Sequence, residues 1–406
     1  MDGFYSPSEI STNRVTLGLV PKCGACGLFK KCQSPKMKVS GRGEYDAMIV
    51  GEVPERTDDE QGKLFVGKAG KLLRNELSQV GLSLDKDFRS TNALICHPPK
   101  SLVADGKMIE YCRPNLMNAI KEYKPKHILL FGRRAVASLI GYLWDSDVGT
   151  MQRWTGWKIP SQELNAWIYP NFHPSYVLRQ EKDRMLARAF QEGIEDAAEH
   201  LMHNGRPWKE VPNYEPKVEV ILDQEHAARR IEAITKSSKA AAFDFETNML
   251  KPDSDRGKIV CCAISNGKET VAYPWHGKAV QATKQFLLSP VKKIGYNLKF
   301  EERWCLAKLG ISVRNWIHDG MIVAHALDYR KEITGLKFQA FVLLGQKRYD
   351  ANVEPYLTGQ KGPDRGQNTE NQIDRVAIRD LLLYCGMDAL LEYEVAKIQK
   401  KVVDGN

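Results

Sequence analysis

Carboxylate side chains recur in three short segments in the second half of this 406-residue sequence. Asp244 and Glu246 stand two residues apart in a strand-like run, so they point to the same face of a sheet. Tyr384 and Asp388 are spaced i, i+4 in a helical pattern, which places them side by side on one helix face. Together with Glu301, such carboxylates could hold two divalent metal ions, one activating a water and one stabilising the departing oxygen of a phosphodiester. The pattern predicts metal-dependent nuclease chemistry, and the alternative is a set of ordinary solvated acids at strand and helix ends.

Four cysteines in the first half form a second candidate centre. Cys23 and Cys26 are separated by two residues, and Cys96 and Cys112 by 15 residues. Four thiolates could hold zinc or an iron-sulfur cluster, and the spacing alone does not choose between them. For Cys96 and Cys112 taken singly, buried and inert thiols are the alternative. The odd total of nine cysteines favours metal ligands or buried thiols over disulfides.

Size and charge narrow the class of protein. A chain of 406 residues is expected to form two or three domains, and its 43% hydrophobic and 27% charged composition is ordinary for globular proteins. The net charge of +9 is consistent with a polyanionic partner. We find no apolar run of about 18 residues and no signal peptide, so we expect a cytoplasmic protein without a membrane partner.

The elements that must position these side chains fall into two regions of the chain. Alternating strands and helices between Tyr45 and Leu201 predict one α/β domain with a mainly parallel sheet covered on both faces. The expected strands are 47–50, 93–95, 127–131 and 166–169, and the expected helices are 70–80, 114–121, 135–141 and 183–202.

Residues 204–216 contain three prolines and a glycine without an apolar period, which predicts a linker between a domain at 1–203 and another at 217–406. The second domain is expected to begin with a helix at 223–237 and strands at 240–245, 259–265 and 270–274, and to end with a helix from near Gln372. Residues 358–372 are poor in apolar side chains, which predicts a mobile loop before that helix.

Residues 217–402 resemble the 3′-5′ proofreading exonuclease domain of bacterial DNA polymerase I, in the RNase H-like DEDD superfamily. Phe243–Thr247 is similar to its first motif, Tyr296–Glu301 to its second, and Tyr384–Asp388 to the third motif of the tyrosine-containing subclass. The resemblance implies an RNase H-like domain with a mixed sheet and two Mg²⁺ or Mn²⁺ ions. The implied catalytic residues are Asp244, Glu246, Glu301, Tyr384 and Asp388; the four carboxylates would bind the metals, and Asn297 would contact DNA.

The second motif departs from the family at one position, because Glu301 stands where the family usually has Asp. The extra methylene moves the carboxylate by about 1.5 Å relative to the backbone. Glu302 is the alternative ligand if the register differs by one residue. Asp319 matches a further family Asp, and an N-cap explains it without chemistry. The segment Gly335–Gln339 is read either as a DNA-tracking strip or as a helix that packs its Leu and Phe inward.

Segments around the cysteines resemble the family 4 uracil-DNA glycosylases over residues 20–202. The similar segments are 51–54, 62–70, 91–92, 96–99, 111–114 and 173–179. The resemblance implies a [4Fe-4S] cluster on Cys23, Cys26, Cys96 and Cys112, with Cys32 as a nearby thiol that is not a ligand.

The same resemblance implies a pocket that flips out a nucleotide and stabilises charge on the departing pyrimidine. Phe65 would stack on the base, Asn92 would read its amide edge, His173 would donate to its carbonyl, and Glu52 would lie beside the attacking water. Leu178 and Arg179 would fill the space left in the duplex. The alternatives are a core role for Phe65, a strand-end turn for Asn92, and a His173 held by its neighbouring proline.

Two departures from this family argue against uracil excision. Glu55 replaces a glycine and would place an anion at the lip of the pocket, and Lys100–Leu102 replaces the usual Asn before an Arg. Our leading hypothesis is a replication or repair protein whose exonuclease trims DNA 3′ ends, while its glycosylase-like domain binds DNA or a polymerase partner. Because the sequence ends soon after Asp388, we expect the polymerase to be a separate subunit. The alternatives are a bifunctional repair enzyme that excises uracil and a non-catalytic adaptor.

Overall fold

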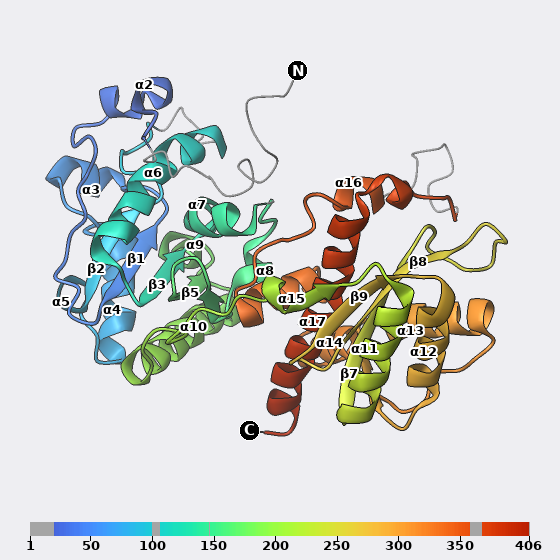
Figure 1. The fold of residues 1–406 in the computed structure, drawn as a ribbon. Coiled ribbons are helices and arrows are strands. Elements are labelled where there is room, and N and C mark those ends of the chain that lie inside the picture. Colours follow the sequence, from blue (N-terminus) through green and yellow to red (C-terminus); the bar gives the residue numbers. More distant parts are fainter. Residues whose placement is uncertain (1–19, 100–105, 146, 358–367, 406) are drawn as a thin grey trace, which may run out of the picture. The chain divides into compact units, whose positions relative to one another are not determined.

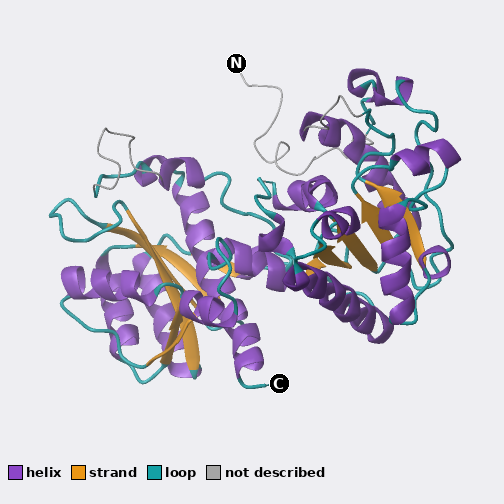
Figure 2. Cartoon of the chain, turned by 180° about the vertical axis from the view of Figure 1, so that it is seen from behind, coloured by secondary structure: helices purple, strands orange, loops and turns teal. Residues whose placement is uncertain are grey.

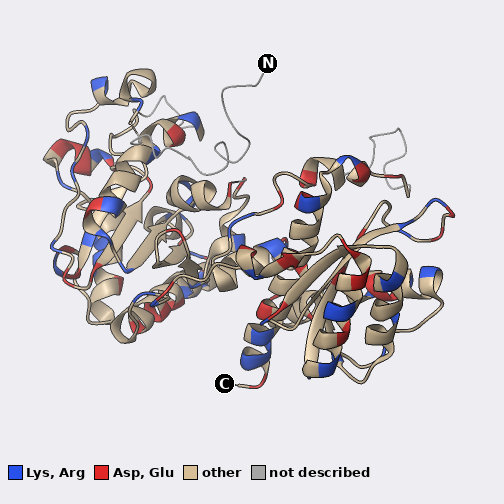
Figure 3. Ribbon diagram, viewed as in Figure 1, with Lys and Arg blue, Asp and Glu red and all other residues tan. Residues whose placement is uncertain are grey.

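The computed structural model describes residues 20–99, 106–145, 147–357 and 368–405, and it divides into two compact units, Met1–Pro207 and Trp208–Asn406. Each unit is a sheet covered by helices on both faces (Figures 1 and 2). Lys and Arg residues are spread over both units, interspersed with Asp and Glu (Figure 3). No helix in the described part of the chain is long and apolar enough to cross a membrane.

The first unit contains a five-stranded sheet in the order β2-β1-β3-β5-β4, parallel except for β4. Its strands are β1 Ala47–Gly51, β2 Phe88–Asn92, β3 His127–Phe131, β4 Ile159–Ser161 and β5 Ala166–Asn171. Its helices are α2 Cys23–Cys26, α3 Arg56–Gln61, α4 Lys68–Gln79, α5 Leu84–Asp87, α6 Gly106–Tyr123, α7 Arg133–Trp144, α8 Met151–Trp154, α9 Pro174–Arg179 and α10 Arg184–His203. The parallel α/β/α architecture expected from the sequence is confirmed.

One strand was predicted in the wrong place. Residues 93–95 were expected to form a strand, but the strand is β2, which ends at Asn92. Leu94 and Ile95 are apolar because they line the cavity between the four cysteines described below. The more polar strand β2 pairs with β1, and all of its residues except Arg89 are buried.

The second unit contains a six-stranded mixed sheet in the order β11-β10-β7-β8-β9-β6. Its strands are β6 Val218–Val220, β7 Ala240–Thr247, β8 Ile259–Ser265, β9 Thr270–Pro274, β10 Lys292–Gly295 and β11 Trp316–Asp319. Its helices are α11 Gln224–Ser237, α12 Gly277–Leu288, α13 Leu298–Trp304, α14 Gly320–Leu327, α15 Leu336–Leu344, α16 Glu354–Leu357 and α17 Ile378–Val403. The mixed sheet is as expected, although the last helix starts at Ile378, after a short 3₁₀ turn at Ile373–Arg375. Most of the loop expected at 358–372 lies outside the described residues.

The central strand β7 is bonded differently along its two edges. It pairs with antiparallel β8 from Ala242 to Thr247, whereas its parallel pairing with β10 ends at Ala242. Helices α11 and α12 cover one face of this sheet and α17 crosses the other. The carboxylate-bearing end of β7 therefore extends beyond β10, under α17.

Candidate metal centres and base pocket

Strand alternation explains how β7 presents two carboxylates. Phe243 and Phe245 point into the apolar core shared with α12, where Phe243 packs edge-on against Phe286. Asp244 and Glu246 must therefore point to the opposite face, which α17 covers. Glu246 is buried, and Asp244 is partly exposed.

Helix α17 brings Tyr384 and Asp388 to this face of the sheet. Both side chains are buried, at 7% and 5% exposure. The helix can lie close to the sheet because Gly386 has no side chain: an added Cβ would stand 2.3 Å from Cγ1 of Val218 and 3.3 Å from Cβ of Ala272. The close approach therefore depends on a glycine inside the motif that carries Tyr384 and Asp388.

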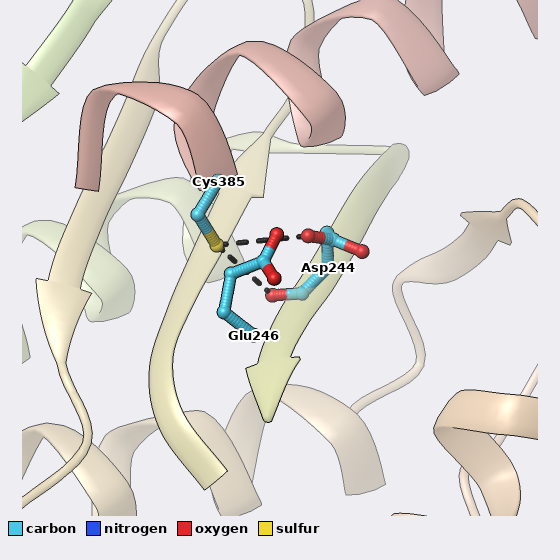
Figure 4. Close-up of side chains that lie close together, drawn as sticks. All are labelled: Asp244, Glu246 and Cys385. Carbon is cyan, nitrogen blue, oxygen red and sulfur yellow. Dashed lines mark hydrogen bonds between the residues drawn. The ribbon is translucent and has the colours of Figure 1, made fainter. Parts of the chain in front are cut away.

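The tightest group of possible ligands contains Asp244, Glu246 and Cys385, whose ligand atoms all lie within 4.8 Å of one another (Figure 4). The thiol of Cys385 donates weakly to the backbone oxygen of Asp244, at 3.6 Å, and to its carboxylate, at 3.7 Å. The predicted pair on β7 and the predicted motif on α17 are thus in contact.

Two further residues complete the surroundings of Asp388: Lys337, from the segment Gly335–Gln339, and Tyr349, which no sequence motif indicated. The ammonium of Lys337 donates to the Tyr384 hydroxyl at 2.8 Å and to the Asp388 carboxylate at 2.5 Å, and the Tyr349 hydroxyl donates to the other oxygen of Asp388. Lys337 also lies 4.5 Å from the ring centre of Tyr384. The segment Gly335–Gln339 forms the start of α15, with its Leu and Phe buried as the helical alternative predicted.

The second motif lies at the start of α13. Glu301 is 2% exposed, and the negative charge of Asp244 is one of the causes, after burial, that raise its pKa. Its neighbour Glu302 bonds instead to the Ser312 hydroxyl at 2.6 Å and to the Trp316 indole at 3.0 Å. Glu302 is thus engaged away from the carboxylate cluster, which favours Glu301 as the ligand.

Asp319 holds the entry to α13 in place. Its carboxylate accepts the backbone N–H groups of Asn297 and Leu298, at 3.0 and 2.9 Å, and it also caps α14 through Met321 and Ile322. The N-cap interpretation of Asp319 is therefore confirmed. Asn297 has a left-handed backbone with φ of 68°, which asparagine tolerates better than most residues.

Burial gives this cluster the electrostatics of a cation site. Burial, followed by repulsion from Asp388, raises the pKa of Asp244 to about 7. Burial and the charge of Asp244 likewise raise the pKa values of Glu246 and Glu301 well above their ordinary range. Among the described residues, Lys337 is the cation that lowers the pKa values of Asp244 and Glu246. Divalent cations would relieve the remaining repulsion, so these side chains fit a metal site.

The four predicted cysteines line one small cavity in the first unit. Cys23 and Cys26 come from α2, Cys112 from α6, and Cys96 from the segment after β2, with Leu28, Phe29, Leu94, Ile95 and Tyr111 completing the lining. The thiols of Cys96 and Cys112 accept from the backbone N–H of Lys36, at 3.2 Å, and from the Asn115 amide, at 3.5 Å. Burial raises the pKa of Cys96 to about 12, so a cation is needed to hold it as thiolate.

All four thiols line the same cavity, so these residues could hold either a zinc ion or an iron-sulfur cluster.

Glu52 and His173 line a second cavity of about 210 Å³ in the first unit, together with Arg179 and Gly132. The carboxylate of Glu52 accepts from the Arg134 guanidinium at 2.9 Å. Nδ1 of His173 accepts the backbone N–H of Ser175 at 3.2 Å, so the neutral ring carries its proton on Nε2. Burial lowers the pKa of His173, which favours this neutral form.

Phe65 and Asn92 lie together at Gly51, the residue before Glu52, and Phe65 is part of the hydrophobic core of this unit. A Cβ added to Gly51 would stand 2.3 Å from the Asn92 amide oxygen and 3.0 Å from the Phe65 ring, so both side chains meet at the end of β1. Phe65 has a positive φ of 57°, which is unusual for an aromatic residue and consistent with strain at a functional site. Leu178 is partly buried and Arg179 exposed at the end of α9.

Glu55 packs against the start of α4. An added Cβ on Gly67 would lie 2.0 Å from its carboxylate, which also accepts the Ala69 backbone N–H. Burial, followed by repulsion from Asp58, raises the pKa of Glu55, while the Ala69 N–H and the charge of Arg179 act in the opposite direction. Arg179 lines the cavity of Glu52 and His173, so Glu55 stays a candidate for the lip of that cavity. The other departure, Lys100–Leu102, lies outside the described residues.

Comparisons with known proteins cover both units. Residues 40–198 match the uracil DNA glycosylase superfamily and residues 218–404 match the 3′-5′ exonuclease family. A type-4 uracil-DNA glycosylase of Pyrobaculum aerophilum is 32% identical over 167 residues, which are 40% of this chain and 82% of that protein.

Two further matches are with a polymerase and with a solved nuclease structure. A DNA polymerase of Bacillus phage SP01 is 24% identical over an alignment of 345 residues, which covers 76% of this chain and 35% of the polymerase. The solved structure of Escherichia coli RNase D aligns with a TM-score of 0.35 and 13% identity, covering 46% of this chain and 45% of that one.

The carboxylate motifs and the cysteine-lined fold thus belong to two families joined in one chain. Through its first unit the protein belongs to the uracil DNA glycosylase superfamily, and through its second it is an enzyme of the 3′-5′ exonuclease family.

Proposed function

We propose that the second unit removes nucleotides from DNA 3′ ends in a proofreading or repair role. Asp244, Glu246, Glu301 and Asp388 would bind two Mg²⁺ or Mn²⁺ ions, and Asn297 would contact the DNA. The observation that carries the proposal is the convergence of carboxylates from β7, α13 and α17, with the Lys337 ammonium beside those of β7 and α17. Bound metal ions would activate a water and stabilise the departing oxygen.

The protein side chains supply orientation and charge balance. Lys337 donates to the Tyr384 oxygen, which leaves the phenol proton to hydrogen-bond a water. Lys337 and Tyr349 hold Asp388 in one rotamer by donating to its two oxygens. The site is therefore preorganised on the α17 side before metal or DNA binds.

The experiment is digestion of 3′-labelled single-stranded DNA with Mg²⁺ by the full chain. Asp244→Asn and Glu301→Gln should abolish digestion, because each removes one ligand charge without changing shape. Glu302→Gln is the matched control, since its carboxylate is bonded elsewhere, and it should keep activity. Digestion that survives Asp244→Asn would refute the proposal.

A DNA polymerase is the partner we propose for the exonuclease. The similarity to the phage polymerase, which extends over 76% of this chain, supports a role at a replicating 3′ end. The proposal predicts faster digestion of primers with mismatched 3′ ends and copurification of a polymerase with the tagged chain from its native cell. Equal rates on matched and frayed ends would argue against proofreading.

For the first unit we propose a [4Fe-4S] cluster on Cys23, Cys26, Cys96 and Cys112 and a role in binding DNA or the polymerase. The apolar cavity that all four thiols share and the similarity to a type-4 uracil-DNA glycosylase support the cluster. Anaerobically purified protein should contain about four iron atoms per chain and a visible absorbance that bleaches on reduction. Stoichiometric zinc without iron would contradict the cluster.

Uracil excision is a second candidate function, because Glu52 and His173 line one cavity and the neutral His173 ring carries its proton on Nε2. The nuclease would be silenced first with Asp244→Asn. The protein would then be incubated with uracil-containing and thymine-only duplexes, followed by alkali. Breaks that are confined to the uracil-containing strand and lost in His173→Ala would establish excision. Intact strands would contradict excision and favour a role in binding DNA or the polymerase.

A further inference from the structure

Glu392 is a buried acid on α17 to which the proposed function gives no role. It follows Asp388 by four residues and Tyr384 by eight, so the three side chains share one face of the helix. Glu392 is 3% exposed, and the charges of Asp244, Glu301 and Asp388 act on it. It therefore belongs spatially to the carboxylate cluster.

One oxygen of Glu392 and one of Glu301 are unusual in the same way. Oε2 of each side chain is buried and has no hydrogen-bond partner among the described residues. An unpaired buried carboxylate oxygen is costly, and native proteins normally give such a group a donor or a cation. The nearby ammonium of Lys337 already bonds to Asp388 and Tyr384.

We propose that Glu392 is a further metal ligand of the exonuclease and that it shares one divalent cation with Glu301. Two carboxylates from α13 and α17 offer the hard oxygen ligands that Mg²⁺ and Mn²⁺ prefer. A cation between them would satisfy both unpaired oxygens and offset the repulsion between the two acids. The proposal rests on the nuclease site described above and adds a fifth carboxylate to it.

The alternative is that Glu392 is a neutral, protonated acid that never meets a metal. Glu392→Gln separates the two, because glutamine has the shape of the protonated acid and lacks the charge. Glu394→Gln is the matched control: it removes the same charge from the same helix, at a carboxylate whose salt-bridge partner is Lys397, 3.6 Å away.

The measurement is Mn²⁺ binding to the full chain, followed by the electron paramagnetic resonance signal of free Mn²⁺. Glu392→Gln should weaken the weaker Mn²⁺ site at least about tenfold, as loss of a metal-supporting group typically does. Glu394→Gln should bind like the unmodified protein. If Glu392→Gln also binds like the unmodified protein, Glu392 is a neutral acid and the proposal is wrong.

Two further variants keep the result decisive. If Glu392→Gln does not fold, Glu392→Leu replaces it, because it also removes the carboxylate, and unchanged Mn²⁺ affinity in that variant overturns the proposal. Asp244→Asn tests the nuclease site itself: if it binds Mn²⁺ normally and digests DNA, the proposed function fails. Loss of binding in Asp244→Asn with unchanged binding in Glu392→Gln refutes only the role of Glu392.

Discussion

Replacing Gly386 with alanine tests how far the catalytic geometry depends on close contact between α17 and the sheet. In a free helix this change would stabilise the protein by about 0.5–1 kcal/mol. Here the new Cβ would stand 2.3 Å from Cγ1 of Val218, so the helix must move by about 1 Å to reach an ordinary contact. Overpacking of this kind costs about 1–3 kcal/mol, so the net effect should be a loss of about 0.5–2 kcal/mol.

The digestion rate of Gly386→Ala should fall by more than the loss of folding stability alone would explain. A displacement of about 1 Å at a catalytic group can cost on the order of a hundredfold in rate. Urea unfolding and initial digestion rates would be compared for Gly386→Ala, Val218→Ala and the double variant. Val218→Ala removes the atom in the way, so the double variant should recover most of the rate that Gly386→Ala loses. A Gly386→Ala protein that is more stable and fully active would refute this account.

Two other predictions concern buried charges. Lys337→Met leaves Asp388 without its cation, so in EDTA the free energy of unfolding should fall by about 3 kcal/mol. This is the lower end for a broken buried ion pair, because the Lys337 side chain is 24% exposed. Added Mn²⁺ should restore most of the melting temperature, and an unchanged melting temperature in EDTA would contradict this prediction. Burial lowers the pKa of His127 to about 4, and its ring bonds to Asn204 and Tyr169. As the pH falls, His127 becomes protonated in the unfolded chain before it does in the folded chain. Up to about 3 kcal/mol of the free energy of unfolding present above pH 6.5 is therefore lost as the pH falls towards 4. His127→Gln should flatten that part of the urea-unfolding profile, and an equal acid sensitivity would show that His127 does not cause it.

Local patterns in the sequence predict the parts of the site that lie on single elements. The period of two places Asp244 and Glu246 on one face of β7, and the i, i+4 spacing places Tyr384 and Asp388 on one face of α17. Both patterns are local, and the backbone geometry of one element decides them. The CxxC pair is also local, but its meeting with Cys96 and Cys112 could be inferred only through the family resemblance.

Contacts between distant elements could not be predicted in this way. Lys337 lies in an apolar helix, and nothing in its local pattern indicates that it reaches Asp388. Glu392 continues the spacing of Tyr384 and Asp388 by another turn, which is the signal that could have found it. The apolar run 93–95 was misread as a strand, because burial around the cysteine cavity produces the same composition as burial in a sheet.

The early end of the pairing between β7 and β10 has a consequence for what the enzyme can recognise. Beyond Ala242, β7 is paired along its β8 edge, so its other edge can offer main-chain donors and acceptors beside Asp244 and Glu246. Main-chain groups are the same whatever the side chains are. A DNA strand bound by them would be contacted at its sugars and phosphates rather than at its bases. Such an edge suits an enzyme that must trim every sequence alike, and alanine scanning would not detect its contribution.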